Sequence, residues 1–341
     1  MKEFQELAAL VVGLGSMGKR RVRNLRALGV GRIIGWDTRE DRRREATERY
    51  GIELADSFEA GMARRPDVLI ISTPPHKHLE FAGAAVQANM HFFMEANSFL
   101  EGMAELAAAL RGRSIVAAPS RTLGFVEGYQ KVKELLDQGL LGPLAGFVHH
   151  CGHALPLWHP WEDYRDFYGG WPEAKGAGWD MIGFELCGLT YLFGDVAVLS
   201  AMYGKRAGFD TPIDDTFQLL LRFESGALGS SMIDVVSPHA YRTLRAVGEK
   251  GIIHYDFEER RVEFFSAETR EWTRFEGQRG QVEPMYHAAE EYYIAELGTF
   301  LRAVTGEGEY PATFEDELTL MRLVEAVRES QESGRHISLE R

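Results

Sequence analysis

A glycine-rich turn directly after an apolar run near the N-terminus constrains the fold more than any other feature. Gly13-Leu14-Gly15-Ser16-Met17-Gly18 has the spacing G-x-G-x-x-G and follows the apolar residues 7–12. In a dinucleotide-binding fold the first glycine permits a tight turn, the second lets a pyrophosphate approach the backbone, and the third lets helix and strand pack closely. We therefore expect a buried strand, this turn, and a helix whose N-terminus holds phosphate groups.

An acidic residue stands where such a fold needs one. Asp37 lies nineteen positions after Gly18, at the end of the next predicted strand, 32–37. Its carboxylate can accept hydrogen bonds from both hydroxyls of an adenine ribose and would repel a 2′-phosphate. We therefore expect NAD as the cofactor, with NADP disfavoured, although Arg39 close by would suit a phosphate.

Strands and helices alternate through the first third of the chain. The predicted strands are 7–12, 32–37, 68–72, 90–94 and 114–118, and the predicted helices between them are 19–28, 39–50, 77–88 and 101–111. This alternation is typical of a doubly wound parallel sheet, so the fold class is α/β. We predict an NAD-binding Rossmann domain over residues 1–124.

The pattern changes after residue 124 to long β-rich segments. These are 144–153, 196–203, 214–223, 227–236, 241–247 and 251–256, accompanied by predicted helices at 128–138, 287–305 and 315–333. Alternating polar and apolar residues in 216–223 and turn residues such as Glu224-Ser225-Gly226 predict a large, mostly antiparallel open sheet. We predict a C-terminal α+β domain for substrate binding and oligomerisation over 125–341. A homodimer or homotetramer would cover the free sheet face, which would otherwise expose apolar surface.

Composition excludes several classes of function. The net charge of −13 disfavours a nucleic-acid partner, and no apolar run approaches the roughly 20 residues that span a bilayer. Two cysteines and an N-terminus without a basic, apolar leader favour the cytoplasm. Three histidines, His149, His150 and His153, lie close together, but no spaced carboxylates or cysteines complete a metal site, so we expect none.

Ser72-Thr73-Pro74-Pro75 follows the third predicted strand. Ligands bind at the carboxyl ends of strands in open α/β sheets. The hydroxyl groups of Ser72 and Thr73 supply hydrogen-bond donors, and Pro74 fixes the backbone. We place these residues in the cofactor site; the alternative is a rigid turn that caps a helix.

Together with further segments over nearly the whole chain, these motifs resemble the Gfo/Idh/MocA family, named for glucose–fructose oxidoreductase and inositol dehydrogenase. The further segments are His78, Phe93-Met94-Glu95, residues 131–136 with Gly139 and Gly142, and residues 300–339. The resemblance implies an NAD-dependent oxidoreductase that acts on a sugar, a cyclitol or a sugar-derived acid. It also implies that His78 and Glu95 belong to the cofactor site.

The chain departs from this family at two catalytic positions. Dehydrogenases of the family carry Glu-Lys-Pro where this chain has Glu95-Ala96-Asn97, and an acid/base histidine four residues after an aspartate, where this chain has Asp180 and Phe184. Alanine and phenylalanine cannot transfer protons. Other residues must therefore do so if the chain is a dehydrogenase.

Oxidation of an alcohol needs a base within hydrogen-bond reach of the hydroxyl. We predict His159, Tyr164, Asp180 and Glu185 as catalytic candidates, and Trp158, Trp161, Asp163 and Arg165 as substrate-binding residues. Glu185 lies in an apolar helix, where desolvation would raise the pKa of its carboxyl. The alternatives are packing for the aromatic residues, a helix cap for Asp180, and an ion pair with an arginine for Glu185.

Three functions remain open on this basis. The first is an NAD-dependent dehydrogenase or reductase acting at a secondary alcohol or ketone. The second is a non-redox sugar enzyme (a hydrolase, lyase or epimerase) that uses bound NAD transiently. The third is an NAD-binding protein that has lost its catalytic activity.

Overall fold

The computed structural model describes residues 2–339, and contacts divide the chain into two compact units. The first unit contains the residues up to Thr122 together with Glu290–Met321, and the second contains Leu123–Ala289 with the residues from Arg322 onward. Residues 290–321 therefore follow the second unit in the sequence but belong to the first by their contacts. Among residues 2–339, no helix is both long and apolar enough to cross a bilayer.

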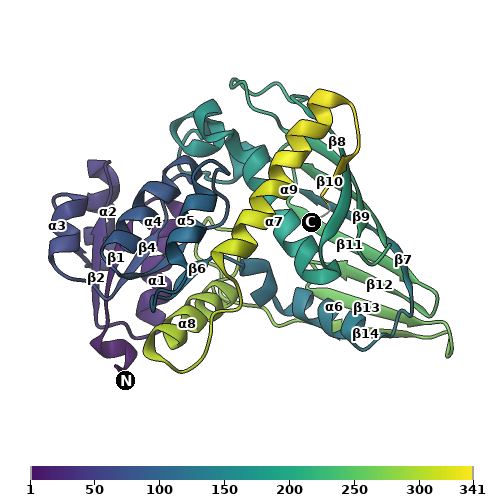
Figure 1. Ribbon diagram of the computed structural model, residues 1–341, viewed down its shortest axis with the longest axis horizontal. Coiled ribbons are helices and arrows are strands. Elements are labelled where there is room, and N and C mark those ends of the chain that lie inside the picture. The colour runs from purple at the N-terminus through teal and green to yellow at the C-terminus, as the bar shows by residue number, and fades with distance from the viewer. Residues whose placement is uncertain (1, 340–341) are drawn as a thin grey trace. The chain divides into compact units, whose positions relative to one another are not determined.

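The first unit is a six-stranded parallel sheet with helices (Figure 1). Its strands are β1 (Ala8–Val12), β2 (Arg32–Trp36), β3 (Glu53–Leu54), β4 (Val68–Ile71), β5 (His91–Met94) and β6 (Ala117–Pro119). Its helices are α1 (Ser16–Ala27), α2 (Glu40–Tyr50), α3 (Phe58–Ala63), α4 (His78–Gln87), α5 (Met103–Leu110) and α8 (Glu291–Thr305). The strand order β3-β2-β1-β4-β5-β6 reverses at β1, which makes the carboxyl ends of β1 and β4 the ligand-binding edge.

The apolar runs that predicted the central strands form the core of this sheet. All four residues of β4 are fully buried, as are the last four of β1. Helix α8 packs on α1, and Leu297, Phe300 and Leu301 join the same apolar cluster. The doubly wound parallel sheet is confirmed, although β3 and α3, both very short, were not predicted.

The second unit is a nine-stranded, mostly antiparallel sheet with helices on one face (Figure 1). Its strands are β7 (Leu144–Gly152), β8 (Val196–Gly204), β9 (Thr216–Phe223), β10 (Leu228–Asp234), β11 (Tyr241–Gly248), β12 (Gly251–Asp256), β13 (Arg261–Ser266), β14 (Trp272–Glu276) and β15 (Ile337–Ser338). The order is β14-β13-β12-β11-β7-β10-β9-β8-β15, in which only β7 and β10 pair in parallel. Helices α6 (Glu127–Asp137) and α7 (Gly176–Phe193) pack on one face, and α9 (Phe314–Ser333) follows α8.

The other face of this sheet carries exposed apolar side chains, and we call it the open face. Among them are Val148, Met202, Leu220, Leu228 and Trp272, each at least half exposed. The open sheet predicted from sequence is therefore confirmed. Strands β13 and β14, which the sequence did not predict, extend it at one edge, where Glu263 and Arg274 form a partly exposed ion pair.

A segment of four short 3₁₀ turns, residues 153–175, connects β7 to α7. Its buried members Leu155 and Phe167 pack with Ala177, Ile213 and Val235 in a small separate core. This segment contains the aromatic and charged residues predicted to bind substrate. Its fold depends on that local core because it contributes no strand to the sheet.

Candidate active site

The glycine-rich turn joins β1 to α1 at the ligand-binding edge. Gly13 has a φ of +85°, and a Cβ there would lie 2.5 Å from the carbonyl oxygen of Ser72. A Cβ at Gly18 would collide with the carbonyl oxygen of Gly13. Both positions therefore require glycine, one for its backbone conformation and one for close packing. Because α1 begins at Ser16 and continues through Met17, the N–H groups of its first turn lie beside this bend.

Asp37, directly after β2, turns its carboxylate toward the glycine turn. Oδ2 accepts the N–H of Leu14 at 2.7 Å, and Oδ1 accepts the N–H of Arg39 at 2.8 Å. The guanidinium of Arg42 lies 4.0 Å from Oδ2 and 3.2 Å from the position that a Cβ on Gly15 would take. A carboxylate and a guanidinium thus both border the turn.

His78 ties together two loops at the carboxyl ends of β4 and β5. Its ring is buried, with Nε2 2.7 Å from the carbonyl oxygen of Thr73 and Nδ1 2.6 Å from that of Asn97. Burial lowers the pKa of this histidine despite the two carbonyl groups. Pro74 follows Thr73 in extended backbone and leads into the turn Pro75–Lys77.

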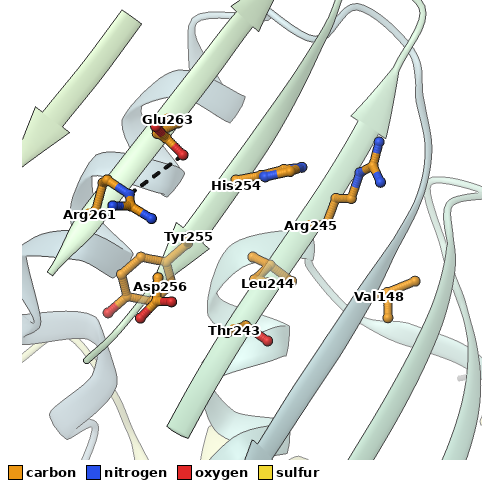
Figure 2. A pocket seen from close by; sticks show the side chains of 9 residues that line it. All are labelled: Val148, Thr243, Leu244, Arg245, His254, Tyr255, Asp256, Arg261 and Glu263. Atoms are coloured by element: carbon orange, nitrogen blue, oxygen red, sulfur yellow. Dashed lines mark ion pairs between the residues drawn. The ribbon is translucent and has the colours of Figure 1, made fainter. Parts of the chain in front are cut away.

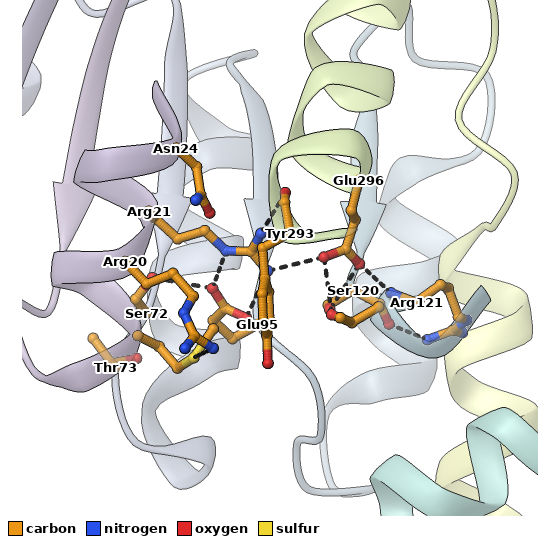
Figure 3. Close-up of polar contacts among 12 residues, drawn as sticks. Arg20, Arg21, Asn24, Ser72, Thr73, Glu95, Ser120, Arg121, Tyr293 and Glu296 are labelled. Atoms are coloured by element: carbon orange, nitrogen blue, oxygen red, sulfur yellow. Dashed lines mark hydrogen bonds and ion pairs between the residues drawn. The ribbon is translucent and has the colours of Figure 1, made fainter. Parts of the chain in front are cut away.

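Glu95 is held by a fully buried arginine of α1 (Figure 3). Its Oε1 accepts Nε of Arg21 at 2.6 Å, and Oε2 accepts Nη2 at 3.0 Å. Nη2 also donates to Glu296 of α8 at 3.0 Å, and the hydroxyl of Ser72 lies 3.4 Å from Glu95 Oε1. The two carboxylates raise the pKa of Arg21, although burial opposes its charge. The network joins β5, α1 and α8 of the first unit.

Glu296 extends this network to the residues that directly follow β6. Its carboxylate accepts the hydroxyl groups of Ser120 and Thr122, both at 2.9 Å, and the N–H of Arg121 at 2.5 Å (Figure 3). Each oxygen of the Glu95 and Glu296 carboxylates therefore accepts a hydrogen bond, and these bonds offset the cost of burying the charge. Sequence reasoning missed Arg21 and Glu296 because they are 275 positions apart.

In the second unit, the residues predicted around position 160 are engaged with one another. His159 Nδ1 lies 2.9 Å from Glu162 Oε1, and its ring packs between Trp161 (4.8 Å between ring centroids) and Phe167 (4.2 Å). The Tyr164 hydroxyl accepts the N–H of Asp210 at 3.0 Å. These contacts hold the shape of the 153–175 segment.

The predicted substrate-binding residues Asp163 and Arg165 form an exposed ion pair. Arg165 Nη2 donates to Asp163 Oδ2 at 2.6 Å, and Nη1 lies 3.2 Å from Asp210. The arginine lowers the pKa of Asp163 to about 2. Trp158, another predicted substrate contact, is partly buried, and its indole N–H donates to the carbonyl oxygen of His153 at 2.9 Å.

Asp180, in the first half of α7, pairs with a tyrosine that the sequence did not single out. The hydroxyl of Tyr168 donates to Asp180 Oδ2 at 3.0 Å, and both side chains are partly exposed. Asp180 stands four residues, about one helical turn, before Phe184. Tyr168 could have been suspected only from its place in the aromatic segment that precedes α7.

The expectation that the pKa of Glu185 is raised is wrong. The carboxylate is fully buried, which opposes its charge, but Arg242 donates to it at 2.6 Å and His149 Nε2 lies 3.1 Å away. These partners outweigh desolvation and lower its pKa to about 2. Glu185 therefore stays ionised and fully bonded, as in the alternative interpretation of an ion pair with an arginine.

The same cluster has the order of a nucleophile–base–acid triad. Ser231 Oγ lies 2.8 Å from His149 Nδ1, and His149 Nε2 faces Glu185. All three side chains are at most 1% exposed, so no substrate reaches the serine. The arrangement stabilises the packing of α7 on the sheet.

Fold and site together define a class of protein: an oxidoreductase with an NAD-binding Rossmann domain. Residues 7–111 match the family model described in those terms. Residues 129–254 match the model of the GFO/IDH/MocA C-terminal domain. The chain belongs to the Gfo/Idh/MocA family, which confirms the resemblance identified from sequence.

One similar protein matches nearly the whole chain, and another matches a little less than two thirds of it. It is 27% identical over 344 residues to a myo-inositol 2-dehydrogenase of Thermotoga maritima, across 97% of this chain and 98% of that protein. It is 24% identical to a levoglucosan dehydrogenase of Pseudarthrobacter phenanthrenivorans, across 63% and 62%.

Solved structures share the fold at lower identity. A levoglucosan dehydrogenase in complex with NADH superposes with a TM-score of 0.86 at 18% identity, over 98% of this chain and 99% of that one. GenD2 from gentamicin A biosynthesis in complex with NAD gives 0.82 at 18% identity, over 100% and 98%.

Proposed function

We propose that the protein is an NAD-dependent dehydrogenase that oxidises a secondary alcohol of a sugar, a cyclitol or a sugar-derived acid, or reduces the matching ketone. The observation that carries the proposal is the pairing of a turn that tolerates only glycine at two positions with the carboxylate of Asp37 beside it. The relatives named above include dehydrogenases of a cyclitol and of an anhydrosugar.

The residues at the ligand-binding edge fit a dinucleotide. The N–H groups of 13–18 would hold the pyrophosphate, and Asp37 would take the adenine-ribose hydroxyls. The hydroxyl groups of Ser72 and Thr73, with Pro74, would line the nicotinamide half. His78 and Glu95 act as positioning residues, because their polar atoms already bind the backbone and Arg21. Bound NAD supplies the hydride acceptor.

In the second unit we assign substrate contacts to the 153–175 segment and to Asp180. Asp180 and Tyr168 present a carboxylate and a hydroxyl side by side, which suits neighbouring hydroxyls of a sugar ring. Trp158 and Trp161 would pack on the apolar face of such a ring. His159 and Tyr164 keep the segment in shape, and Glu185 plays no part in proton transfer.

We further propose that a second copy of the chain covers the open face in a homodimer or homotetramer. A hollow of about 380 Å³ lies on this sheet between β7, β11, β12 and β13, bordered by Val148, Arg245 and Glu263 (Figure 2). Exposed apolar side chains over several strands, with polar groups beside them, are typical of a protein interface.

The decisive experiment is turnover of NAD with a panel of myo-inositol, levoglucosan, hexoses and uronic acids. Accumulation of NADH with one of them supports a dehydrogenase. Conversion of a sugar without accumulation of NADH would instead indicate the non-redox enzyme that reuses its NAD. Tight NADH binding with neither reaction would indicate loss of catalysis. Ala96 and Phe184 would agree with that outcome, because they occupy the positions where the family has its catalytic lysine and histidine.

A further inference from the structure

Arg245 of β11 stands exposed on the open face without a counterion (Figure 2). In register it lies beside Val148 of β7 and His254 of β12. The next side chains of β11 on the same face are Thr243 and Val247. Burial and the nearby Arg245 lower the pKa of His254, so its ring stays neutral at neutral pH. None of these four neighbours supplies a negative charge, and over residues 2–339 the Arg245 side chain forms no hydrogen bond or ion pair.

Asp256 of β12 is the matching anion at the edge of the same hollow. Among the residues that the structure describes, no cation pairs with its carboxylate. Glu263, the other acid of the hollow, differs, because Arg274 donates to it at 2.9 Å and Arg261 lies 3.5 Å from it (Figure 2). Of the charged groups that border the hollow, Arg245 and Asp256 are therefore the two without a counterion in the described chain.

The two groups do not neutralise each other within one chain. Asp256 pairs in register with Thr243, so it lies diagonally across from Arg245, and diagonal neighbours are about 7–8 Å apart. In Figure 2 the guanidinium extends away from Asp256. Water solvates both charges while the face is free. Once another protein surface covers them, each charge would lose its hydration and oppose association unless it gained a counterion.

We propose that, when a second copy covers the open face, Arg245 of each copy pairs with the partner's Asp256. The inference rests on the homo-oligomer proposed above and gives that interface its register. In a two-fold interface the same patch of both copies meets, so a contact between two positions occurs twice. The two ion pairs would supply the counterions that both groups lack, and the hollow of about 380 Å³ offers room for these side chains. The apolar neighbours Val148 and Val247 would exclude water around them.

The test reverses the two charges, in Arg245→Glu and in Asp256→Arg. In each variant alone, like charges meet at both contacts, so we expect its dissociation constant to rise by about a hundredfold or more. In an equimolar mixture of the two variants, an acid meets an arginine at both contacts. The mixed oligomer should therefore form with a dissociation constant within about tenfold of the wild type. Analytical ultracentrifugation with one variant labelled by a fluorophore distinguishes this mixed oligomer from self-association.

Arg44→Glu is the matched control. It makes the same charge reversal at an exposed arginine of α2, in the first unit, which likewise forms no ion pair in the described chain. It should keep the self-association of the wild type. An unchanged circular dichroism spectrum and unchanged NADH affinity show that each variant is folded.

The outcomes separate the ion pair from the interface itself. Wild-type association of both single variants, with loss of association in Leu220→Glu, would refute the pair and leave the open-face interface in place. Single variants that dissociate but do not associate when mixed would refute Asp256 as the partner of Arg245. A wild type that is monomeric at every concentration would overturn the proposed interface and the pair with it.

Discussion

The Arg242 guanidinium of β11 and the Glu185 carboxylate of α7 face each other across 2.6 Å, and the Glu185 side chain is fully buried. Arg242 also lies over the ring of Phe257, 4.7 Å from its centroid, and 5.8 Å from that of Phe184. Glu185 follows Phe184, the position where the family has its acid/base histidine. It therefore anchors α7 to the sheet and takes no part in proton transfer.

Removing one partner of this pair should destabilise the protein strongly. In Glu185→Ala the Arg242 charge stays buried without its counterion, so we expect a loss of about 3–5 kcal/mol in the free energy of unfolding, measured with urea. Glu134→Ala is the control, because its pair with Lys131 on α6 is partly exposed and should contribute no more than about 1 kcal/mol. Equal losses in the two variants would contradict the prediction.

The same carboxylate should make stability depend on acid pH. Its pKa is lowered from 4.5 to about 2 in the folded protein, so its contribution is complete above pH 4.5 and is lost as the pH falls toward 2. Glu185→Gln cannot ionise and should show a flatter decline of unfolding free energy between pH 4.5 and 3. Parallel curves for variant and wild type would argue against the ion pair.

Gly13→Ala should weaken cofactor binding. An alanine at φ +85° is strained, and its Cβ would press on the carbonyl oxygen of Ser72. A cost of about 1–3 kcal/mol corresponds to NADH affinity about tenfold to a hundredfold weaker, measured by calorimetry. Gly29→Ala is a strict control, since Gly29 has a φ of +78° with nothing within 4 Å of its Cβ position. The interpretation fails if the two variants bind NADH alike.

Asp37→Ser should shift the preference from NAD toward NADP. The substitution removes the carboxylate that would repel a 2′-phosphate and leaves Arg39 and Arg42 beside the turn. We expect NADH affinity to fall by about tenfold or more, and the ratio of NADPH to NADH affinity to rise by more than that. Asp41→Ser, in the same segment but exposed and paired with Arg39, should leave the ratio unchanged.

Leu220→Glu should weaken self-association. Leu220 is 61% exposed on the open face, and a charge buried there without a partner would raise the dissociation constant by about a hundredfold or more. Light scattering at several protein concentrations measures the change. Tyr191→Glu, on an exposed position of α7, should keep the oligomer of the wild type. A wild type that is monomeric at all concentrations would refute the assignment.

Local sequence patterns predicted the elements that bury continuous apolar runs. The residues of β1 and β4 contain no polar side chain, and the glycine spacing between β1 and α1 leaves few alternatives to a nucleotide turn. Alternation of polar and apolar residues did not predict β14, because four of its five residues are exposed and the strand has no buried apolar face. It also could not show that α8, which follows the second unit in the sequence, packs on α1.

The sequence by itself determined the doubly wound sheet, the glycine turn and the acid at the end of β2, because apolar runs, their alternation with helical segments and the spacing of glycine and aspartate are visible in the order of residues. The tertiary structure alone decided which candidate residues can carry a proton. The pKa of Glu185 depends on Arg242, which is 57 positions away in the sequence. Electrostatic interactions act through space, so the protonation state of a buried group depends on its neighbours in the folded protein. Those neighbours can be far away in the sequence, and the sequence alone does not identify them.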